Sequence, residues 1–70
     1  MQIKVIDFLE MVKEEKFDIY VNGIQVGDGV EYYEVRQKYY NSELPILLDR
    51  AMGCNVIKVD FKCRRVFAEE

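Results

Sequence analysis

The pattern of apolar and polar positions in the first third of the chain predicts a helix and then a β-hairpin. In residues 7–15 the apolar side chains gather on one side of a helical turn and the charged side chains on the other. Asp7 and Glu10 have the spacing of a capping box, in which the first residue caps the helix and the second closes back on it. We therefore expect a helix over residues 7–15 with Asp7 as its cap.

The hairpin is predicted by Asn22-Gly23, which stands between two runs of strand-forming residues within 17–26. Both residues accept the positive φ that the central positions of a type I′ turn require. A two-residue turn fixes the register, with Val21 opposite Ile24 and Ile19 opposite Val26, so the residues predicted to share the core face are Phe17, Ile19, Val21, Ile24 and Val26. Tyr20 and Gln25 then pair on the other face.

Residues 30–40 fit two different structures. The segment Gly27–Gly29 is expected to end the hairpin as a turn. Asp28 and Glu31 repeat the capping-box spacing, which favours a helix over residues 30–40. The valine and tyrosine content of the same residues suits a strand equally well. The sequence pattern therefore does not decide between a helix and a strand for residues 30–40.

The last third of the chain predicts a helix and a closing strand. Apolar residues at helical spacing indicate a helix over residues 44–52, with Gly53 as the left-handed residue that ends it. Alternation then predicts a half-buried strand whose core side carries Ile57, Val59, Phe61 and Cys63 and whose outer side carries Lys58, Asp60, Lys62 and Arg64. Because the alternation fails after Cys63, the strand either turns back near residues 62–64 into a second hairpin or continues through a bulge. We prefer the hairpin, since a single strand would be unusually long.

These elements predict one α+β domain over residues 1–70, with helices packed on one face of a small antiparallel sheet of three to four strands. A chain of this length builds only one core, and a deep pocket would remove contacts from that core. Function is therefore expected at the surface of the domain.

Charge, apolar runs and cysteine content limit where in the cell the protein is expected to act. The net charge is −3, and it divides into −5 for residues 1–35 (three Lys against eight acids) and +2 for residues 36–70 (seven Lys or Arg against five acids). No apolar run approaches the about 20 residues that cross a bilayer, and we expect no secretion signal and no membrane partner. Cys54 and Cys63 are expected to be reduced core thiols, which favours the cytoplasm.

The residue types argue against catalysis and metal binding. The chain has no His, which excludes Ser-His and Cys-His nucleophile pairs within it and leaves too few ligands for four-coordinate zinc. The acidic pairs Glu14-Glu15 and Asp28 with Glu31 are expected on a solvated face or at a helix cap, where nothing separates their pKa values. We expect a protein that is not an enzyme and that uses no cofactor or metal.

A resemblance rests on the order of four segments: the helix start Val5–Leu9, the strand Phe17–Val21, the Leu-rich segment Leu44–Ala51 and the strand Val56–Val59. This order resembles small uncharacterised proteins encoded by phages and mobile elements of Gram-positive bacteria. The resemblance implies a compact accessory protein that acts by binding a host or phage component, and some proteins of that kind inhibit defence systems. It carries over no functional residue.

Two binding hypotheses follow. Five tyrosines in 70 residues favour a protein partner, because aromatic side chains give contact area at little entropic cost. Four of them, Tyr32, Tyr33, Tyr39 and Tyr40, either cover the core or leave at least one exposed pair. The alternative is nucleic acid bound by Lys and Arg with tyrosines stacking on bases, against which stands a pI near 4.9. A homodimer is a further arrangement that the sequence allows.

The predicted partner-binding residues fall into two groups, one on the outer sheet face and one in the tyrosine-rich segment. They are Tyr20, Gln25, Tyr32, Arg36, Tyr39, Lys58, Lys62 and Arg64.

Overall fold

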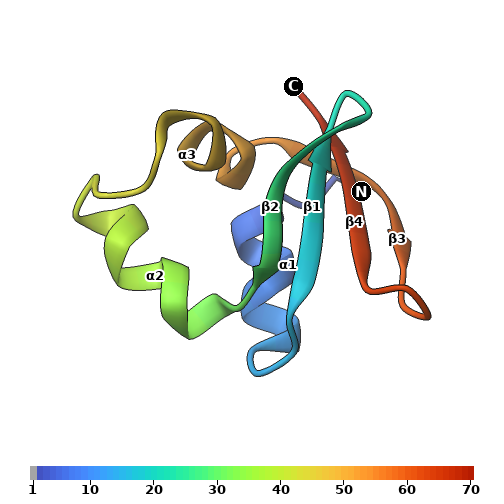
Figure 1. The fold of residues 1–70 in the computed structure, drawn as a ribbon, viewed down its shortest axis with the longest axis horizontal. Helices are drawn as coiled ribbons and strands as arrows, with labels where there is room; N and C mark the ends of the chain where they lie inside the picture. The colour runs from blue at the N-terminus through green and yellow to red at the C-terminus, as the bar shows by residue number, and fades with distance from the viewer. Residues whose placement is uncertain (1) are drawn as a thin grey trace.

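Three helices and four strands make up the fold (Figure 1). The computed structural model describes residues 2–70, and its elements are α1 (Val5–Val12), β1 (Phe17–Val21), β2 (Ile24–Val30), α2 (Tyr32–Tyr40), α3 (Ile46–Met52), β3 (Asn55–Asp60) and β4 (Arg65–Glu69). The strands form one sheet in the order β2-β1-β4-β3. Helices α1 and α3 pack on one face of it, and α2 lies beyond the β2 edge. The predicted α+β class with four strands and helices on one face is confirmed.

The sheet is mixed, which corrects the prediction of an antiparallel sheet. Two antiparallel hairpins, β1–β2 and β3–β4, meet at a parallel pair in which Asp18 lies opposite Arg65 and Val21 opposite Ala68. The chain crosses from β2 through α2 and α3 to the far edge at β3, and β4 then returns between β3 and β1. The preferred C-terminal hairpin is therefore confirmed, but its second strand joins β1 in parallel.

The Asn22-Gly23 turn closes the first hairpin as predicted, with φ values of 51° and 83°. Tyr20 pairs with Gln25 next to the turn, but Ile19 lies opposite Gly27 instead of Val26. The register shifts there, so β2 carries an extra residue and the simple alternation ends. Ile24 lies opposite Val21 as predicted, but next to the turn its side chain is exposed and does not enter the core.

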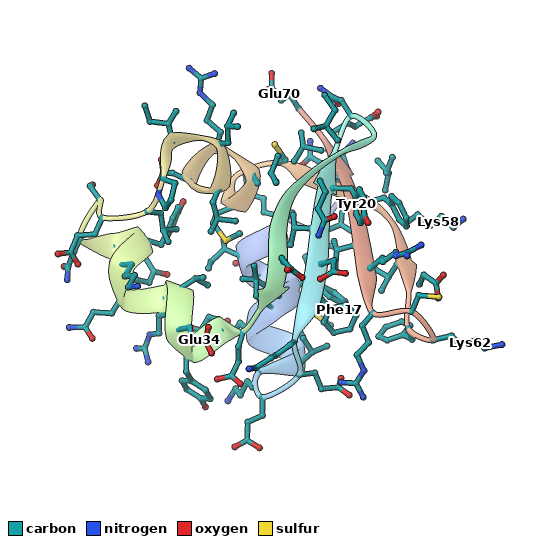
Figure 2. All side chains as sticks on the ribbon, viewed as in Figure 1. Phe17, Tyr20, Glu34, Lys58, Lys62 and Glu70 are labelled. Carbon is teal, nitrogen blue, oxygen red and sulfur yellow. The ribbon has the colours of Figure 1, made fainter. Side chains whose placement is uncertain are left out.

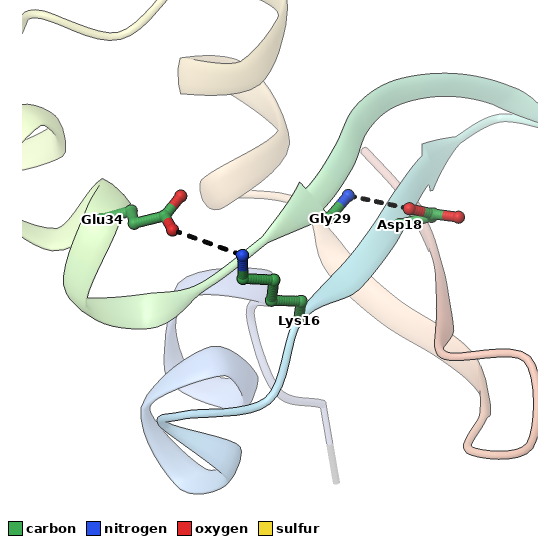
Figure 3. A network of polar contacts seen from close by, with 4 residues as sticks. All are labelled: Lys16, Asp18, Gly29 and Glu34. Atoms are coloured by element: carbon green, nitrogen blue, oxygen red, sulfur yellow. Dashed lines mark hydrogen bonds and ion pairs between the residues drawn. The ribbon is translucent and has the colours of Figure 1, made fainter.

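The segment Gly27–Gly29 continues β2 and does not end the hairpin, which corrects the predicted turn. A Cβ atom at Gly27 would lie 2.8 Å from Val30 Cγ2 and 3.2 Å from Leu48 Cδ1, so only glycine lets the strand pass this close to α3. Gly29 has a φ of 59°, and its N–H donates to Asp18 Oδ1 at 2.8 Å (Figure 3). The Asp18 carboxylate thus provides a hydrogen-bond acceptor for the Gly29 N–H at the point where the register of the β1–β2 pairing shifts.

Helices form in the predicted segments, but their ends and caps differ: α1 ends at Val12 and not at residue 15, and α3 begins at Ile46 and not at residue 44. Helix α1 begins at Val5 after Lys4, which makes no side-chain cap, so Asp7 lies in the first turn and is not the cap. Within residues 30–40, for which the sequence allowed either a helix or a strand, Tyr32–Tyr40 form helix α2. Its N-cap residue, Glu31, also makes no side-chain capping hydrogen bond. Gly53 follows α3 with a φ of −92°, so it is not the left-handed residue expected there.

The core lies between the sheet and helices α1 and α3. Its largest fully buried side chains are Val5, Leu9, Phe17, Ile19, Met52 and Val66. The ring of Phe17 packs edge-on against Phe8 with centroids 5.2 Å apart, and Phe61 lies 6.0 Å from Phe17 on the side toward solvent. Full burial of one such side chain contributes roughly 1.5–3 kcal/mol, so this cluster is central to stability.

The core side predicted for the closing strand is only partly correct. Val59 packs against the core, but Ile57 is the extra residue of a bulge between Val56 and Lys58 and is exposed. Phe61 and Cys63 lie in the turn, where both are exposed. Cys54 is buried as expected, whereas the expectation of a core thiol at Cys63 is wrong.

Candidate functional site

The open face of the sheet carries an aromatic pair at its centre. Tyr20 of β1 lies directly opposite Phe67 of β4, and both rings point away from the helices because their neighbours Ile19 and Val66 face the core. The two ring centroids are 5.2 Å apart with an interplanar angle of 25°, a stacked arrangement. Both side chains are partly exposed, so the pair forms a small apolar platform on the sheet.

Two cations flank this platform. Lys58 pairs with Phe67 across β3 and β4, and its Nζ lies 5.7 Å from the Phe67 centroid. Arg65 Cζ lies 6.0 Å from the centroid of Tyr20. Both cations are exposed, and ring faces attract cations within about 6 Å. The outward face of the β1–β4–β3 region is therefore apolar at its centre and carries charges of both signs around it. Lys58 and Arg65 lie beside the rings, and the carboxylates on the same face are those of Asp18, Asp60 and Glu69.

Gln25 completes the platform on the β2 side. The hydroxyl of Tyr20 donates to Gln25 Oε1 at 3.4 Å, and Gln25 Nε2 donates to the carbonyl of Gly27 at 3.2 Å. These contacts hold the tyrosine ring in place on a surface that is otherwise open to solvent. We name the set Tyr20, Gln25, Lys58, Arg65 and Phe67 the platform.

The structure brings together three of the predicted partner-binding residues, Tyr20, Gln25 and Lys58. Lys62 lies in the β3–β4 turn, away from Tyr20 (Figure 2). Arg64 lies in the same turn, and its Nη1 is 3.7 Å from Glu15 Oε1 in an exposed ion pair. These two cations border the sheet but do not contact the aromatic pair.

The predictions for the tyrosine-rich segment need correction. Tyr32 is buried in the core, its hydroxyl donates to Glu10 Oε2 at 3.0 Å, and its pKa is raised by burial and by that carboxylate. A side chain in this position supports the fold and offers no surface to a partner. Tyr39 also packs against the core and is only partly exposed. Arg36 lies with its Cζ 5.9 Å from the Tyr32 centroid, on the outer side of α2.

The exposed tyrosine pair of α2 is Tyr33 and Tyr40. Together with Arg36, Gln37 and Asn41 they surround a shallow hollow of about 420 Å³. The spacing of these residues places them on one face of the helix, opposite the buried Tyr32 and Val35. The sequence allowed either burial of all four tyrosines or at least one exposed pair, and in the structure Tyr33 and Tyr40 are exposed.

Sequence reasoning missed Phe67 and Arg65. The alternation that predicts the closing strand fails between Arg64 and Phe67, because Arg64 still belongs to the turn, where its φ is 56°. From Arg65 onwards the strand alternates strictly, with Val66 and Ala68 buried. Starting the alternation one residue later would have placed Arg65 and Phe67 on the outer face.

Other reactive groups are isolated. Cys54 is buried, its Sγ donates to the carbonyl of Arg50 at 3.3 Å, and its pKa is raised by burial and then by Glu70. Asp60 accepts the backbone N–H of Cys63 at 3.0 Å, which lowers the pKa of its carboxyl. Among residues 2–70 no group of three or more His, Cys, Asp or Glu side chains is placed to hold a metal ion.

Comparison of the chain with protein-family models, with curated proteins and with solved structures found no match. In the part of the chain that the structure describes, no helix has the length and apolar character needed to cross a bilayer.

Proposed function

We propose that this protein is a non-enzymatic binding module that holds another protein on the open face of its sheet. The observation that carries the proposal is the Tyr20–Phe67 pair between Lys58 and Arg65. Tyrosine and arginine are enriched among the residues that dominate binding energy at protein interfaces, and such residues act from apolar centres with polar surroundings. The platform has this composition.

The charges of the platform define the partner. An apolar side chain of the partner would cover the two rings, and its carboxylates would pair with Lys58 and Arg65. Such pairs are stronger at an interface than on an exposed surface, because the partner excludes water from them. A protein surface with an apolar centre therefore fits this face best if its border has carboxylates that meet Lys58 and Arg65 and basic groups that meet Asp18, Asp60 and Glu69.

Single-stranded nucleic acid is the second candidate, and one observation favours it. Two rings on adjacent central strands, with a cation beside each, match the way sheet surfaces stack bases and hold phosphates. Two features weigh against it: the net charge is −3, and the carboxylates of Asp18, Asp60 and Glu69 lie on the same sheet face, where they would repel phosphates. We therefore rank it below a protein partner.

The resemblance to small phage and mobile-element proteins gives the proposal its setting. In that setting the partner would be a host or phage protein, and a component of a defence system is one such target. The genes that lie beside the coding sequence test this part of the proposal separately, since a cluster of defence inhibitors, a set of phage structural genes and a replication module point to different partners.

The test is a pull-down with the purified protein as bait, from lysate treated or not treated with nuclease. We expect partners that survive nuclease and that are lost with Tyr20→Ala and with the double variant Lys58→Glu/Arg65→Glu. Tyr40→Ala and Lys38→Glu are matched controls, because they remove an exposed tyrosine and an exposed cation of α2. Circular dichroism checks that every variant is folded.

Two outcomes of the pull-down would contradict the proposal. Partners retained by both platform variants would place binding elsewhere, with the Tyr33 and Tyr40 face of α2 as the next surface to examine. Loss of all partners on nuclease treatment would favour nucleic acid. In that case, binding of a fluorescent uridine or thymidine 12-mer should weaken log-linearly with salt, whereas a tyrosine-centred protein interface should weaken far less.

A further inference from the structure

A second surface lies at the end of the sheet that carries the Asn22-Gly23 turn. An apolar cleft of about 220 Å³ runs there between the β1–β2 hairpin and α3. Its walls include Val21, Ile24, Leu47, Arg50 and Glu70. This surface is formed by other residues than the platform and faces the helix side of the sheet.

Two large aliphatic side chains of the cleft wall, and one that neighbours the wall on α3, are not covered by the rest of the protein. Ile24 is 68% exposed, Leu47 is 64% exposed, and Ile46, beside Leu47 on α3, is 73% exposed. Scattered single apolar residues are ordinary on a surface, but a contiguous group of large ones marks an interaction site. The cost of keeping them in water is considerable, since burial of each contributes up to roughly 1.5–3 kcal/mol.

Two opposite charges lie at the same cleft. Arg50 comes from α3, and Glu70 follows β4, whose end reaches the region of the hairpin turn (Figure 2). Both side chains are exposed, and neither forms an ion pair with another of residues 2–70. The apolar group is therefore accompanied by one positive and one negative charge from different elements.

We propose that the occupant of this cleft is a second copy of the same chain, related to the first by a two-fold axis through the apolar group. A two-fold axis presents the same patch on both copies, so a patch that carries both signs of charge can be complementary to itself. In this arrangement Arg50 of each copy meets Glu70 of the other, while Ile24, Ile46 and Leu47 are buried between them. The cleft of each copy accepts an aliphatic side chain of its partner.

The size of the cleft supports this occupant over a free small molecule. Pockets that enclose drug-sized ligands span about 300–1,000 Å³, and this cleft is smaller. It has room for one side chain, and the exposed aliphatic residues of an identical chain supply one. The dimer leaves the platform free, so it is independent of the proposed protein partner and presents two platforms on one particle.

The test is the oligomeric state of the purified full chain by sedimentation velocity over a concentration series. We expect a concentration-dependent dimer for the wild type and a monomer for Leu47→Glu, because a charge cannot be buried in the apolar centre without a partner. Ile57→Glu is the matched control: Ile57 is an exposed aliphatic residue of β3, far from the cleft in the sheet order. It should dimerise like the wild type.

Charge reversal distinguishes the specific two-fold pairing of Arg50 with Glu70 from non-specific hydrophobic association. Arg50→Glu and Glu70→Arg should each weaken the dimer by about tenfold or more, and the double variant should recover most of the affinity, since the pair is restored with its signs exchanged. A wild type that stays monomeric at millimolar concentration would overturn the proposal. So would a dimer that survives Leu47→Glu, an equal loss in Ile57→Glu, or a double variant no better than the single ones.

Discussion

The two faces of the sheet are built from alternate residues of the same strands, yet their side chains have different uses. In β1 and β4, Ile19 and Val66 face the helices and are fully buried. Their neighbours Tyr20 and Phe67 face outward, where they stack on each other and remain partly exposed. A covered face needs shape and volume, whereas the open face combines aromatic rings with charge. The difference teaches that the packing that stabilises the fold lies on the covered side of this sheet, while the open side keeps aromatic and charged groups in contact with solvent.

The strongest test of this comparison removes one large ring from each face. Phe17→Ala should lower the free energy of unfolding by about 3–5 kcal/mol, because it leaves a cavity in the core beside Phe8 and Phe61. Phe67→Ala should cost only about 1 kcal/mol, since the ring is partly exposed and its loss leaves no enclosed cavity. Urea denaturation measures both values.

A loss of 3–5 kcal/mol is large for a domain of this size, so Phe17→Leu provides a milder version that keeps the protein measurable. It should fall between the wild type and Phe17→Ala. Equal costs for Phe17→Ala and Phe67→Ala would contradict the division of roles between the two faces.

The second prediction concerns the space on the covered face. Gly27→Ala should lower stability by about 1–3 kcal/mol, because the new Cβ would lie 2.8 Å from Val30 Cγ2 and 3.2 Å from Leu48 Cδ1 and would force both side chains to shift. Thermal unfolding followed by circular dichroism reports the loss. Leu48→Ala should make room for the new Cβ, so the double variant should lose less stability than the sum of the losses of Gly27→Ala and Leu48→Ala. A loss equal to that sum would show that the collision is not the cause.

The third prediction concerns the turn that assigns residues to the two faces. Gly23→Val should cost about 1–2 kcal/mol, because a β-branched residue strongly disfavours a φ of 83° although nothing crowds the position. A one-residue slip of the strands would exchange the faces, so the turn also protects the placement of Tyr20. A melting temperature equal to that of the wild type would contradict this role of the turn.

The smallest expected effect is the pH dependence contributed by the β3–β4 turn. The pKa of Asp60 is lowered chiefly by the N–H of Cys63, so its carboxylate stabilises the fold above the pKa of the unfolded state, near 4, and this stabilisation is lost as the pH falls through the lower folded pKa. Asp60→Asn should therefore melt below the wild type at pH 7, and the gap should narrow in acid below pH 4. A gap that is independent of pH would rule out the carboxylate as its source.

Local signals allowed much of the fold to be predicted from the sequence. The Asn22-Gly23 turn, the helical spacing of residues 44–52 and the alternation of the closing strand each depend on a few adjacent residues. Helix caps were less predictable. Asp7 has the right spacing for a capping box, but α1 begins two residues earlier. There Lys4 forms a β-bridge with Asn55, and the N–H of Val5 donates to the carbonyl of Cys54, so contacts with residues far along the sequence set the start of the helix.

The features that were missed depend on contacts between distant residues. Gly27 resembles a turn residue, and only the approach of Leu48 from α3 explains its place in a strand. The parallel pairing of β1 with β4 follows from where the chain returns after α3, which no local pattern encodes. Three of the five platform residues, Tyr20, Gln25 and Lys58, were predicted from the sequence, but Phe67 lies beside Tyr20 only through that parallel pairing.

The position of β4 between β1 and β3 has a consequence for the order of folding. Its residues are the last of the sheet to leave the ribosome, yet they occupy a central place. Until then the inner edge of β1, with its unpaired N–H and C=O groups, is open to other chains, as are the apolar side chains beside it. Pairings between distant residues are slow to form, so the nascent protein should depend on rapid synthesis of β4 or on a chaperone that shields β1 until β4 arrives.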